Sequence, residues 1–478
     1  MKYLGALFLG VVAGFAFQLE IPLVVLVLVL AGMFALTLRS TGKQWVFQWS
    51  LFGFSQFFVG LNWLNVVGVD IVILVSMFCS LSFISASLVA NVLKLSLDRT
   101  LVFVITLTLF ENIRDSFPFG GFGWLQYGMA LIDTPLMIFH RALPQLLMTL
   151  LVLGTSALIG LSLFNVLSKR HYVYFAVSSV LLSGVSLINL VEIDESQIFT
   201  VVAVQGGVER YGLGVLGDRT EVLKNHIEIT RENANAINSA DLVVWPENSL
   251  DVDPKIDLVA KNLLSQIDEI ITPPILLGSV LSPTNASRSN TSLELDGGIT
   301  EIYTKQRLVP FGEFLPYRGF ATSITERAAL LPYDFVAGNT PGVWKRDGLQ
   351  VSIGICFEVA DSQIVHEDVE HSDFILIQTN NATYQFSNQS EQQLLYAKIR
   401  SIETGRPLIS ASTSGISALI SDNVVLQTIG KGEKGVIAFE VNNYSGKTIT
   451  STLVGYAGWI VFVLWLMSCG VALRRRSK

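Results

Sequence analysis

Long apolar stretches separated by short polar connections fill the first 194 residues, and one more apolar stretch lies near the C-terminus. A helix that crosses a bilayer needs about 20 mostly apolar residues. Eight segments come near this length, so the pattern predicts eight membrane spans. These segments are residues 3–19, 22–38, 46–66, 69–93, 100–116, 140–167, 172–192 and 452–473.

The first apolar segment has a second interpretation, a cleaved secretory signal peptide. Gly14-Phe15-Ala16 has the small-x-small pattern of a cleavage site. The tripeptide lies inside the apolar run, with no polar stretch before it, and another apolar segment follows at once. A retained membrane helix is therefore the favoured interpretation.

The pattern changes after residue 195, where short β-rich apolar runs alternate with helical patterns such as 219–238 and 389–404. The runs include IFTVVAVQ, DLVVWPE, PPILLGSV, VSIGICFE and DFILIQT. Continuous apolar runs of this length are typical of strands that are buried on both faces. The region is therefore predicted to be α/β, with a sheet covered by helices. The polar stretch NASRSN, 285–290, is expected to be an exposed loop.

Composition agrees with this division of the chain. Hydrophobic residues make up 51% of the chain, charged residues only 15%, and the mean hydropathy is +0.52. These values exclude a disordered chain and a protein that is soluble throughout. Charge is concentrated in 195–450, which holds 19 basic and 31 acidic residues. A domain of net charge −12 has no electrostatic reason to bind nucleic acid, so no such partner is predicted.

Basic residues in the short connections orient the spans, because cytoplasmic loops are enriched in Lys and Arg. With eight spans, four basic clusters fall on the cytoplasmic side, and only Arg114 and Arg141 lie on the other. The predicted domains are 1–194, a membrane domain with seven transmembrane helices; 195–450, an extracytoplasmic catalytic domain; and 451–478, a C-terminal transmembrane helix with a basic cytoplasmic tail. The clusters are Arg39 and Lys43, Lys94 and Arg99, Lys169 and Arg170, and Arg474 to Lys478.

The connection 111–136 is rich in Phe, Trp, Tyr and Gly. Aromatic residues of this kind collect where lipid meets water, so an interfacial belt is the first expectation. The alternative is that this loop forms part of a rim through which lipid enters an adjacent site.

The chain has three cysteines. Cys79 and Cys469 lie in apolar segments, and Cys356 is the only cysteine in 195–450, so that region forms no internal disulfide. An unpaired thiol outside the cytoplasm is chemically exposed and needs a reason to be present.

Three motifs near strand ends supply a chemical reason for Cys356. VVWPEN contains Glu247, YTKQRLVPFGEF contains Lys305 and Glu313, and GICFE contains Cys356 and Glu358. A cysteine nucleophile acts as the thiolate, a glutamate of raised pKa can accept its proton, and a lysine can stabilise an oxyanion. Together these groups suffice for acyl transfer through a thioester, although each alone also has a purely structural interpretation.

No cofactor or metal is predicted. None of the five histidines pairs with cysteine at a zinc-binding spacing, and no phosphate-binding loop motif is present. One GxGxxG string, GLGVLG at 212–217, is separated by GGVERY from the apolar run before it. A dinucleotide-binding loop follows its strand directly. The string is therefore interpreted as a flexible loop.

WPEN, K-x2-LVPFGE and G-x-C-x-E, in this order, resemble the nitrilase or carbon-nitrogen hydrolase superfamily. With eight spans around such a domain, the chain resembles the bacterial apolipoprotein N-acyltransferases over nearly its whole length. The strings TNNAT and STSGISA are most similar to the high-GC Gram-positive branch. The resemblance implies an αββα sandwich outside the membrane, joined to a multi-pass α-helical membrane domain of about eight spans.

The resemblance also implies roles for the motif residues. Glu247 corresponds to the general base, Lys305 to the charge stabiliser and Cys356 to the nucleophile, while Glu313 and Glu358 correspond to glutamates placed around the site. The chain departs from the family at Phe357, where tyrosine is frequent after the nucleophile.

The implied reaction moves a fatty acyl chain from a membrane phospholipid, through a cysteine thioester, to the α-amine of the N-terminal diacylglyceryl-cysteine of apolipoproteins. The expected partners are thus a phospholipid donor, diacylglyceryl-apolipoproteins and membrane lipid, and the expected location is the bacterial cell membrane. Two alternatives remain at this point. One is a membrane-bound amidase that uses the same triad with water as acceptor, and the other is a scaffold whose nitrilase-like domain only binds a partner.

Overall fold

The computed structural model describes residues 2–19, 21–93, 96–208, 220–284, 286–319, 322, 331–384 and 386–476. The chain forms two compact units. A helical unit comprises Met1–Asn189 and Thr448–Lys478, and an α/β unit comprises Leu190–Lys447. The predicted loop at 212–217 lies outside the described residues.

The helical unit contains a helix in each of the eight apolar segments predicted to span a membrane. Among the described residues, three helices are both long and apolar enough to cross a bilayer, Val69–Asn91, Gln145–Ser162 and Ile449–Arg475. The count of eight spans therefore stays a prediction. The elements are α1 (Lys2–Ala16), α2 (Val25–Thr37), α3 (Gly42–Gly60), η1 (Asn62–Val66), α4 (Val69–Asn91), α5 (Ser96–Ser116), η2 (Tyr127–Leu131), η3 (Pro135–Arg141), α6 (Gln145–Ser162), α7 (Lys169–Ser186), α14 (Ile449–Leu453), η9 (Val454–Tyr456) and α15 (Ala457–Arg476).

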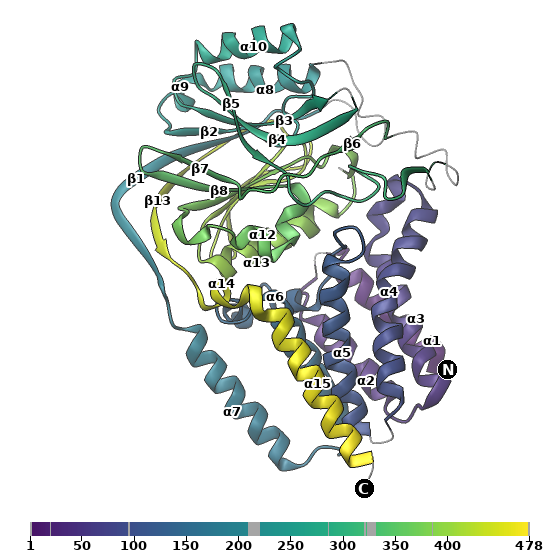
Figure 1. The fold of residues 1–478 in the computed structure, drawn as a ribbon. Helices are drawn as coiled ribbons and strands as arrows, with labels where there is room; N and C mark the ends of the chain where they lie inside the picture. The colour runs from purple at the N-terminus through teal and green to yellow at the C-terminus, as the bar shows by residue number, and fades with distance from the viewer. Residues whose placement is uncertain are drawn as a thin grey trace. The chain divides into compact units, whose positions relative to one another are not determined.

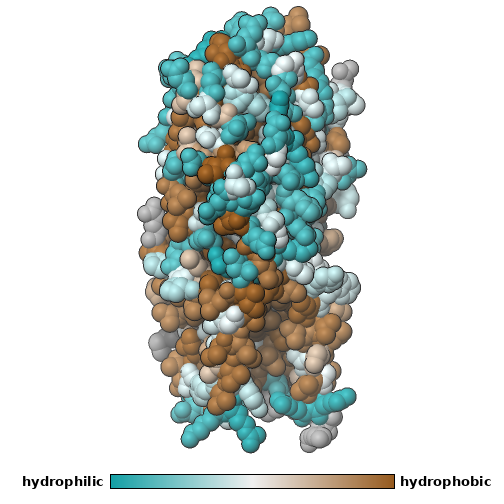
Figure 2. Space-filling view, turned by 90° about the vertical axis from the view of Figure 1, so that its left-hand side faces the viewer, coloured by the Kyte–Doolittle hydropathy of each residue, from teal (hydrophilic) through white to brown (hydrophobic). Residues whose placement is uncertain are grey.

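The outer surface of the helical unit is apolar. Figure 2 shows that hydrophobic residues dominate its visible face, whereas hydrophilic residues dominate that of the α/β unit. Helix α7 is the extreme case, since Tyr174, Val180 and Leu181 are each more than 60% exposed. A helix that is apolar on an exposed side is stable where lipid surrounds it. The chain is accordingly an integral membrane protein.

The aromatic connection after α5 folds back into the helical unit. Trp124 and Tyr127 are each 2% exposed, so the expected interfacial belt is wrong for this part of the connection, although Phe117 remains 67% exposed. Polar side chains of the helices satisfy its backbone: Arg114 donates to the Trp124 carbonyl (2.8 Å), and the Gly128 N–H donates to Thr149 (3.0 Å). Irregular backbone inside a helical unit is tolerated where protein groups satisfy its N–H and C=O groups in this way.

The α/β unit contains two sheets. Its elements are β1 (Val191–Gln205), α8 (Glu221–Glu232), α9 (Ala234–Ile237), β2 (Leu242–Val244), α10 (Leu258–Asp268), β3 (Ile275–Thr284), β4 (Ser287–Leu295), β5 (Ile299–Thr304), β6 (Asp334–Phe335), β7 (Val343–Arg346), β8 (Leu349–Ile355), η6 (Cys356–Ala360), α12 (Ser362–His366), η7 (Val369–His371), β9 (Phe374–Thr379), η8 (Ala382–Tyr384), α13 (Gln389–Thr404), β10 (Leu408–Ser412), β11 (Ser417–Ser421), β12 (Val424–Ile429) and β13 (Gly435–Gly446).

The first sheet has the strand order β13-β1-β2-β3-β4-β5, with β6 paired to β4, and the second has the order β12-β11-β10-β9-β8-β7. Parallel strands form the centre of each sheet, β1-β2-β3 in the first and β8-β9-β10 in the second. Helices α8, α9 and α10 cover the outer face of the first sheet, and α12 and α13 cover that of the second (Figure 1). The predicted α/β domain is thus an αββα sandwich.

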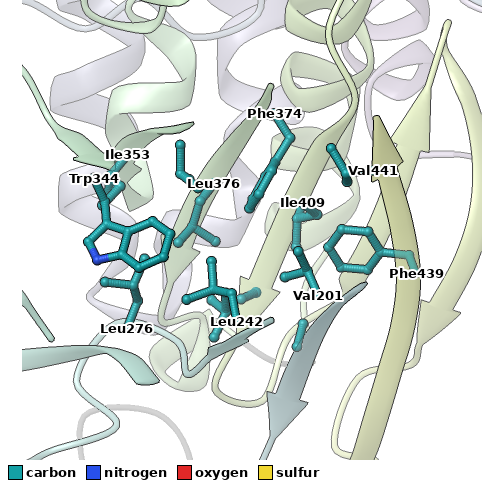
Figure 3. Close-up of a cluster of buried hydrophobic side chains, with 14 of the residues drawn as sticks. Val201, Leu242, Leu276, Trp344, Ile353, Phe374, Leu376, Ile409, Phe439 and Val441 are labelled. Atoms are coloured by element: carbon teal, nitrogen blue, oxygen red, sulfur yellow. The ribbon is translucent and has the colours of Figure 1, made fainter. Parts of the chain in front are cut away.

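The inner faces of the two sheets bury a continuous apolar core (Figure 3). Val201, Leu242 and Leu276 come from the first sheet, and Ile353 and Leu376 come from the second. All five are at most 3% exposed. Burial of one such side chain stabilises the fold by about 1.5–3 kcal/mol. This core fixes the two sheets against each other and therefore fixes the strand ends that carry the motifs.

One polar stretch belongs to a strand and not to a loop. Ser287–Leu295 forms β4, which pairs with β3 on one side and β5 on the other, so the exposed loop expected at 285–290 is wrong for its described part beyond residue 286. Asn290 is only 2% exposed. The Asn290 side-chain N–H groups donate to Glu247 and Glu313, which lie in the candidate site.

Candidate active site

Glu247 follows the carboxyl end of β2 and is 5% exposed. The Asn290 side-chain amide donates to its carboxylate at 2.6 Å, and the Thr413 hydroxyl donates to its backbone carbonyl at 2.7 Å. Gly278 on β3 permits this placement, since a Cβ there would lie 2.6 Å from the Glu247 Cα atom. Strand β2, the close approach of β3 at Gly278 and the two hydrogen bonds together hold the Glu247 carboxylate in one position.

Lys305 comes directly after β5, and its side chain is 1% exposed. Its Nζ lies 2.8 Å from Glu313 Oε1 and 3.8 Å from Glu247 Oε1. The second oxygen of Glu313 accepts from the Val309 N–H at 2.7 Å, which closes the LVPFGE loop on itself. Glu313 therefore both pairs with the lysine and shapes the loop that follows it.

Cys356 begins η6 at the point where β8 ends. Its φ angle is +55°, a left-handed conformation that is uncommon for any residue other than glycine. A nucleophile held in a sharp turn between a strand and a helix presents its side chain outward from the sheet. The Glu247 carboxylate and the Lys305 ammonium both act electrostatically on the Cys356 thiol, so the fold brings Glu247, Lys305 and Cys356 together.

Glu358 lies two residues beyond the cysteine and is fully buried. One carboxylate oxygen accepts from the Gln306 and Arg307 N–H groups and the Tyr303 hydroxyl, at 2.7–2.9 Å. The other accepts from the Ile355 N–H at 2.7 Å. Glu358 thus links the segment after Lys305 to the strand that precedes Cys356.

Burial and mutual charge shift the pKa values of these groups. Burial raises the pKa of Glu247, while Lys305 partly opposes this effect. Burial raises the pKa of the Cys356 thiol to about 12, and the Glu247 carboxylate adds to the increase. Burial alone would lower the pKa of Lys305, but the Glu313 and Glu247 carboxylates raise it far above its usual value.

These electrostatics suit proton transfer between Glu247 and Cys356. A carboxylate of raised pKa is a stronger base, and it lies next to a thiol that is protonated at neutral pH. Lys305 stays charged beside both. Burial also raises the pKa of Glu358 to about 7, and its oxygens accept from backbone N–H groups and from Tyr303.

The five predicted site residues all lie in this region of the α/β unit, whereas Asn290, Thr379 and Gln393 were not foreseen. Thr379 and Gln393 come from the TNNAT and NQSEQQ segments. The available signal in the sequence was their run of amide side chains, several of which the structure buries. Asn290 was hidden by its position in a stretch that looks like a surface loop.

Two family models match the chain. Residues 9–158 match the N-terminal domain of apolipoprotein N-acyltransferase, and residues 200–449 match the carbon-nitrogen hydrolase model. A Mycolicibacterium smegmatis apolipoprotein N-acyltransferase is 37% identical over 235 residues, 46% of this chain, and the match spans 39% of that relative's length. Relatives of the same name match more completely. The Aquifex aeolicus protein is 27% identical, and the match covers 81% of this chain and 88% of that relative. The Vibrio vulnificus protein is 24% identical, and the match covers 92% of this chain and 88% of that relative.

Proposed function

Because the chain belongs to the carbon-nitrogen hydrolase family and also carries an apolipoprotein N-acyltransferase N-terminal domain, we propose that it is an acyltransferase of lipoprotein maturation. It moves a fatty acyl chain from a membrane phospholipid to the α-amine of the N-terminal S-diacylglyceryl-cysteine of apolipoproteins. The resemblance inferred from the motifs is confirmed by these matches, which include a relative from a high-GC actinobacterium.

The observation that carries the proposal is the presence of both domains in one chain. A hydrolase that acts on small soluble amides has no use for an apolar helical unit, whereas both substrates of the proposed reaction are lipids held in a bilayer. The Glu-Lys-Cys arrangement of the α/β unit supplies the covalent chemistry, and the helical unit supplies a membrane location.

The first half-reaction forms the acyl-enzyme. Glu247 accepts the Cys356 proton while the sulfur attacks the ester carbonyl of the phospholipid. Lys305 stabilises the oxyanion as the C–S bond forms. The ester C–O bond then breaks, and Glu247 returns the proton to the departing lysophospholipid oxygen. A thioester on Cys356 remains.

The second half-reaction transfers the acyl group from Cys356 to the acceptor amine. The α-amine of the diacylglyceryl-cysteine attacks the thioester carbonyl and loses a proton to Glu247. The C–S bond breaks, the amide product leaves, and the proton returns to the Cys356 sulfur. Lys305 stabilises the second oxyanion as it did the first. Glu313 supports Lys305 in both steps through the 2.8 Å ion pair.

The four basic clusters support a multi-pass arrangement in the bacterial cell membrane, with 195–450 on the extracytoplasmic face. Lipoprotein N-termini are exposed on that face after export, so this orientation also suits the acceptor. Cys356 then works outside the reducing cytoplasm, where a region with one cysteine has no internal disulfide partner for it.

The test is to incubate the purified full-length protein with phospholipid vesicles and to map the added mass. One acyl group should appear on the peptide that contains Cys356, hydroxylamine should release it, and Cys356→Ala should show no label. A diacylglyceryl-peptide should then remove the acyl group and gain its mass. Acylation of Cys79, Cys469 or a serine would contradict the assignment. Release of free fatty acid, with no transfer to the peptide, would establish a hydrolase instead.

A further inference from the structure

Asn290 contacts all three charged residues at the first-sheet side of the candidate site. It lies on β4 and is only 2% exposed. Its backbone carbonyl accepts from the Lys305 N–H at 2.9 Å. Its side-chain amide donates to Glu247 Oε1 at 2.6 Å and to Glu313 Oε1 at 3.2 Å. One neutral residue therefore contacts the proposed base, the proposed cation and the glutamate that pairs with this cation.

The two carboxylates fix the orientation of the Asn290 side chain. Its Nδ2 carries two hydrogens, and one oxygen of each carboxylate accepts from this nitrogen. A flipped amide would place Oδ1 against the same two oxygens, with no hydrogen between them and with like partial charges in contact. The nitrogen is therefore the atom that faces Glu247 and Glu313.

The Glu247 oxygen that accepts from Asn290 is also the one that lies near Lys305. Glu247 Oε1 is 3.8 Å from Lys305 Nζ, beyond the range of about 2.7–2.9 Å for a charge-assisted hydrogen bond. Glu313 Oε1 is within this range, at 2.8 Å. Among the residues that the structure describes, Glu313 is the one hydrogen-bond acceptor of Nζ. The other ammonium hydrogens thus remain for a reacting oxygen.

A direct ion pair between Glu247 and Lys305 would work against the proposed chemistry. Opposite charges attract strongly away from water, so a Glu247 carboxylate without an anchor would close on the ammonium. The pair would occupy a hydrogen that the oxyanion needs, and it would lower the pKa of Glu247 and weaken the base. Already at 3.8 Å, Lys305 lowers the pKa of Glu247 more than the Asn290 hydrogen bond does.

We propose that Asn290 is a positioning residue that anchors the Glu247 carboxylate through a neutral hydrogen bond and so keeps it from closing on Lys305. The inference rests on the proposed roles of Glu247 as base and Lys305 as oxyanion donor. Glu247 then keeps its basicity for the Cys356 proton, and Lys305 keeps hydrogens for the oxyanion. Glu313 meanwhile holds the lysine through the 2.8 Å ion pair.

The test measures acylation of Cys356 by a p-nitrophenyl ester of a fatty acid, as a burst of p-nitrophenol from the purified full-length protein. Asn290→Leu keeps the approximate size of the side chain and removes both donors. It should lower the maximal burst rate about 10- to 100-fold, the usual effect of one hydrogen bond to a charged group. The acid limb of the pH–rate profile should move to lower pH, because a carboxylate paired directly with Lys305 ionises more readily.

The acid limb separates positioning from a purely structural role. A structural role would lower the burst rate without moving this limb. A limb that stays in place, or that moves to higher pH, would overturn the proposal. Asn290→Ala provides a second measurement if Asn290→Leu does not fold, and the same shift is expected from it. Lys305, Glu313 and Cys356, the ionisable groups that act on Glu247, are unchanged in both variants.

Thr291→Val is the matched control, because Thr291 is the next residue of β4 and is also buried. Its hydroxyl is hydrogen bonded to the hydroxyls of Ser289 and Thr304, at 3.1 and 3.2 Å. This variant should keep the burst rate and the pH profile of the wild type. A shift equal to that of Asn290→Leu would assign the Asn290 effect to distortion of the strand and contradict the proposal.

Asn290→Leu in a Glu247→Gln background tests whether Asn290 acts through the base. Its effect on the burst rate should be clearly smaller than in the wild type, since the group that Asn290 positions is already lost. Fully additive effects would show that Asn290 does not act through Glu247. The activated ester needs no phospholipid and no acceptor peptide. A protein that gives the expected bursts but takes no acyl group from phospholipid would thus contradict the proposed function and not this inference.

Discussion

The two sheets of the sandwich contribute different chemistry to the same site. The first sheet supplies the ionisable groups, with Glu247 after β2 and Lys305 after β5. The second sheet supplies the sulfur of Cys356 after β8, the buried Glu358 carboxylate two residues later, and neutral groups such as Thr379 at the end of β9. The proposed base and cation thus come from one sheet, and the proposed nucleophile comes from the other.

The difference shows that a buried site must meet two requirements, partners for its charges and a fixed geometry for its cysteine. Buried charges need partners, so Lys305 lies between two carboxylates at 2.8 and 3.8 Å. A cysteine in a left-handed turn needs fixed geometry, which Glu358 supplies at the Ile355 N–H and Gln393 supplies at the Cys356 carbonyl. Neither sheet alone contains the candidate site, because the proposed base and the proposed nucleophile follow strands of different sheets.

Removal of the proposed base, Glu247, tests the contribution of the first sheet most strongly. Glu247→Gln should lower the rate of acyl-enzyme formation by about 10²–10⁴-fold, the usual contribution of general base catalysis. Alkylation of Cys356 by iodoacetamide, located by mass spectrometry, should respond differently in this variant. After burial, the Glu247 carboxylate is the next cause of the raised thiol pKa, so its loss lowers that pKa and leaves more thiolate at pH 9. Alkylation at pH 9 should therefore be no slower than in wild type. Slower alkylation there would show that the variant is misfolded or that the charge has another role.

Substitution of Lys305 should have the next largest effect. Loss of one oxyanion donor typically costs about 10²–10³-fold in rate, so Lys305→Ala should slow acylation by that amount. Lys305→Arg keeps the charge, but a planar guanidinium does not fit a position 2.8 Å from Glu313 that is built for a compact ammonium. We expect Lys305→Arg to fail nearly as badly when the rate of acyl-enzyme formation is measured in a single turnover. A normal acylation rate in Lys305→Ala would remove the charged half from the catalytic scheme.

Two glutamates provide the finest comparison, since they support the same site in different ways. Glu358→Gln would turn an amide toward backbone donors that now meet a carboxylate, so we expect a loss of about 1–3 kcal/mol in the free energy of unfolding. Glu313→Gln should remain folded and slow acylation, because its principal partner is Lys305. Thermal unfolding and acylation rates, measured on both variants, separate these outcomes. An equally unstable Glu313→Gln would make both glutamates structural.

Several features could be predicted from the sequence because they depend on local pattern. Apolar length gave the helices, continuous β-rich runs gave the α/β domain, and the three motifs gave Glu247, Lys305 and Cys356 with their two glutamates. The aromatic connection was misjudged at Trp124 and Tyr127, since composition does not show whether a polar helix residue such as Arg114 satisfies the backbone of a segment that folds into the helical unit.

The sequence by itself determined which residue types are available for chemistry, because a nucleophile, a base and a cation carry their reactivity in their own side chains. Only the tertiary structure decided how they act. The left-handed turn at Cys356, whose carbonyl accepts from Gln393, depends on contacts between segments that are distant along the chain. The placement of Asn290 against Glu247 joins residues 43 positions apart. Such contacts follow from the packing of two sheets over one apolar core, which no local pattern of residues specifies.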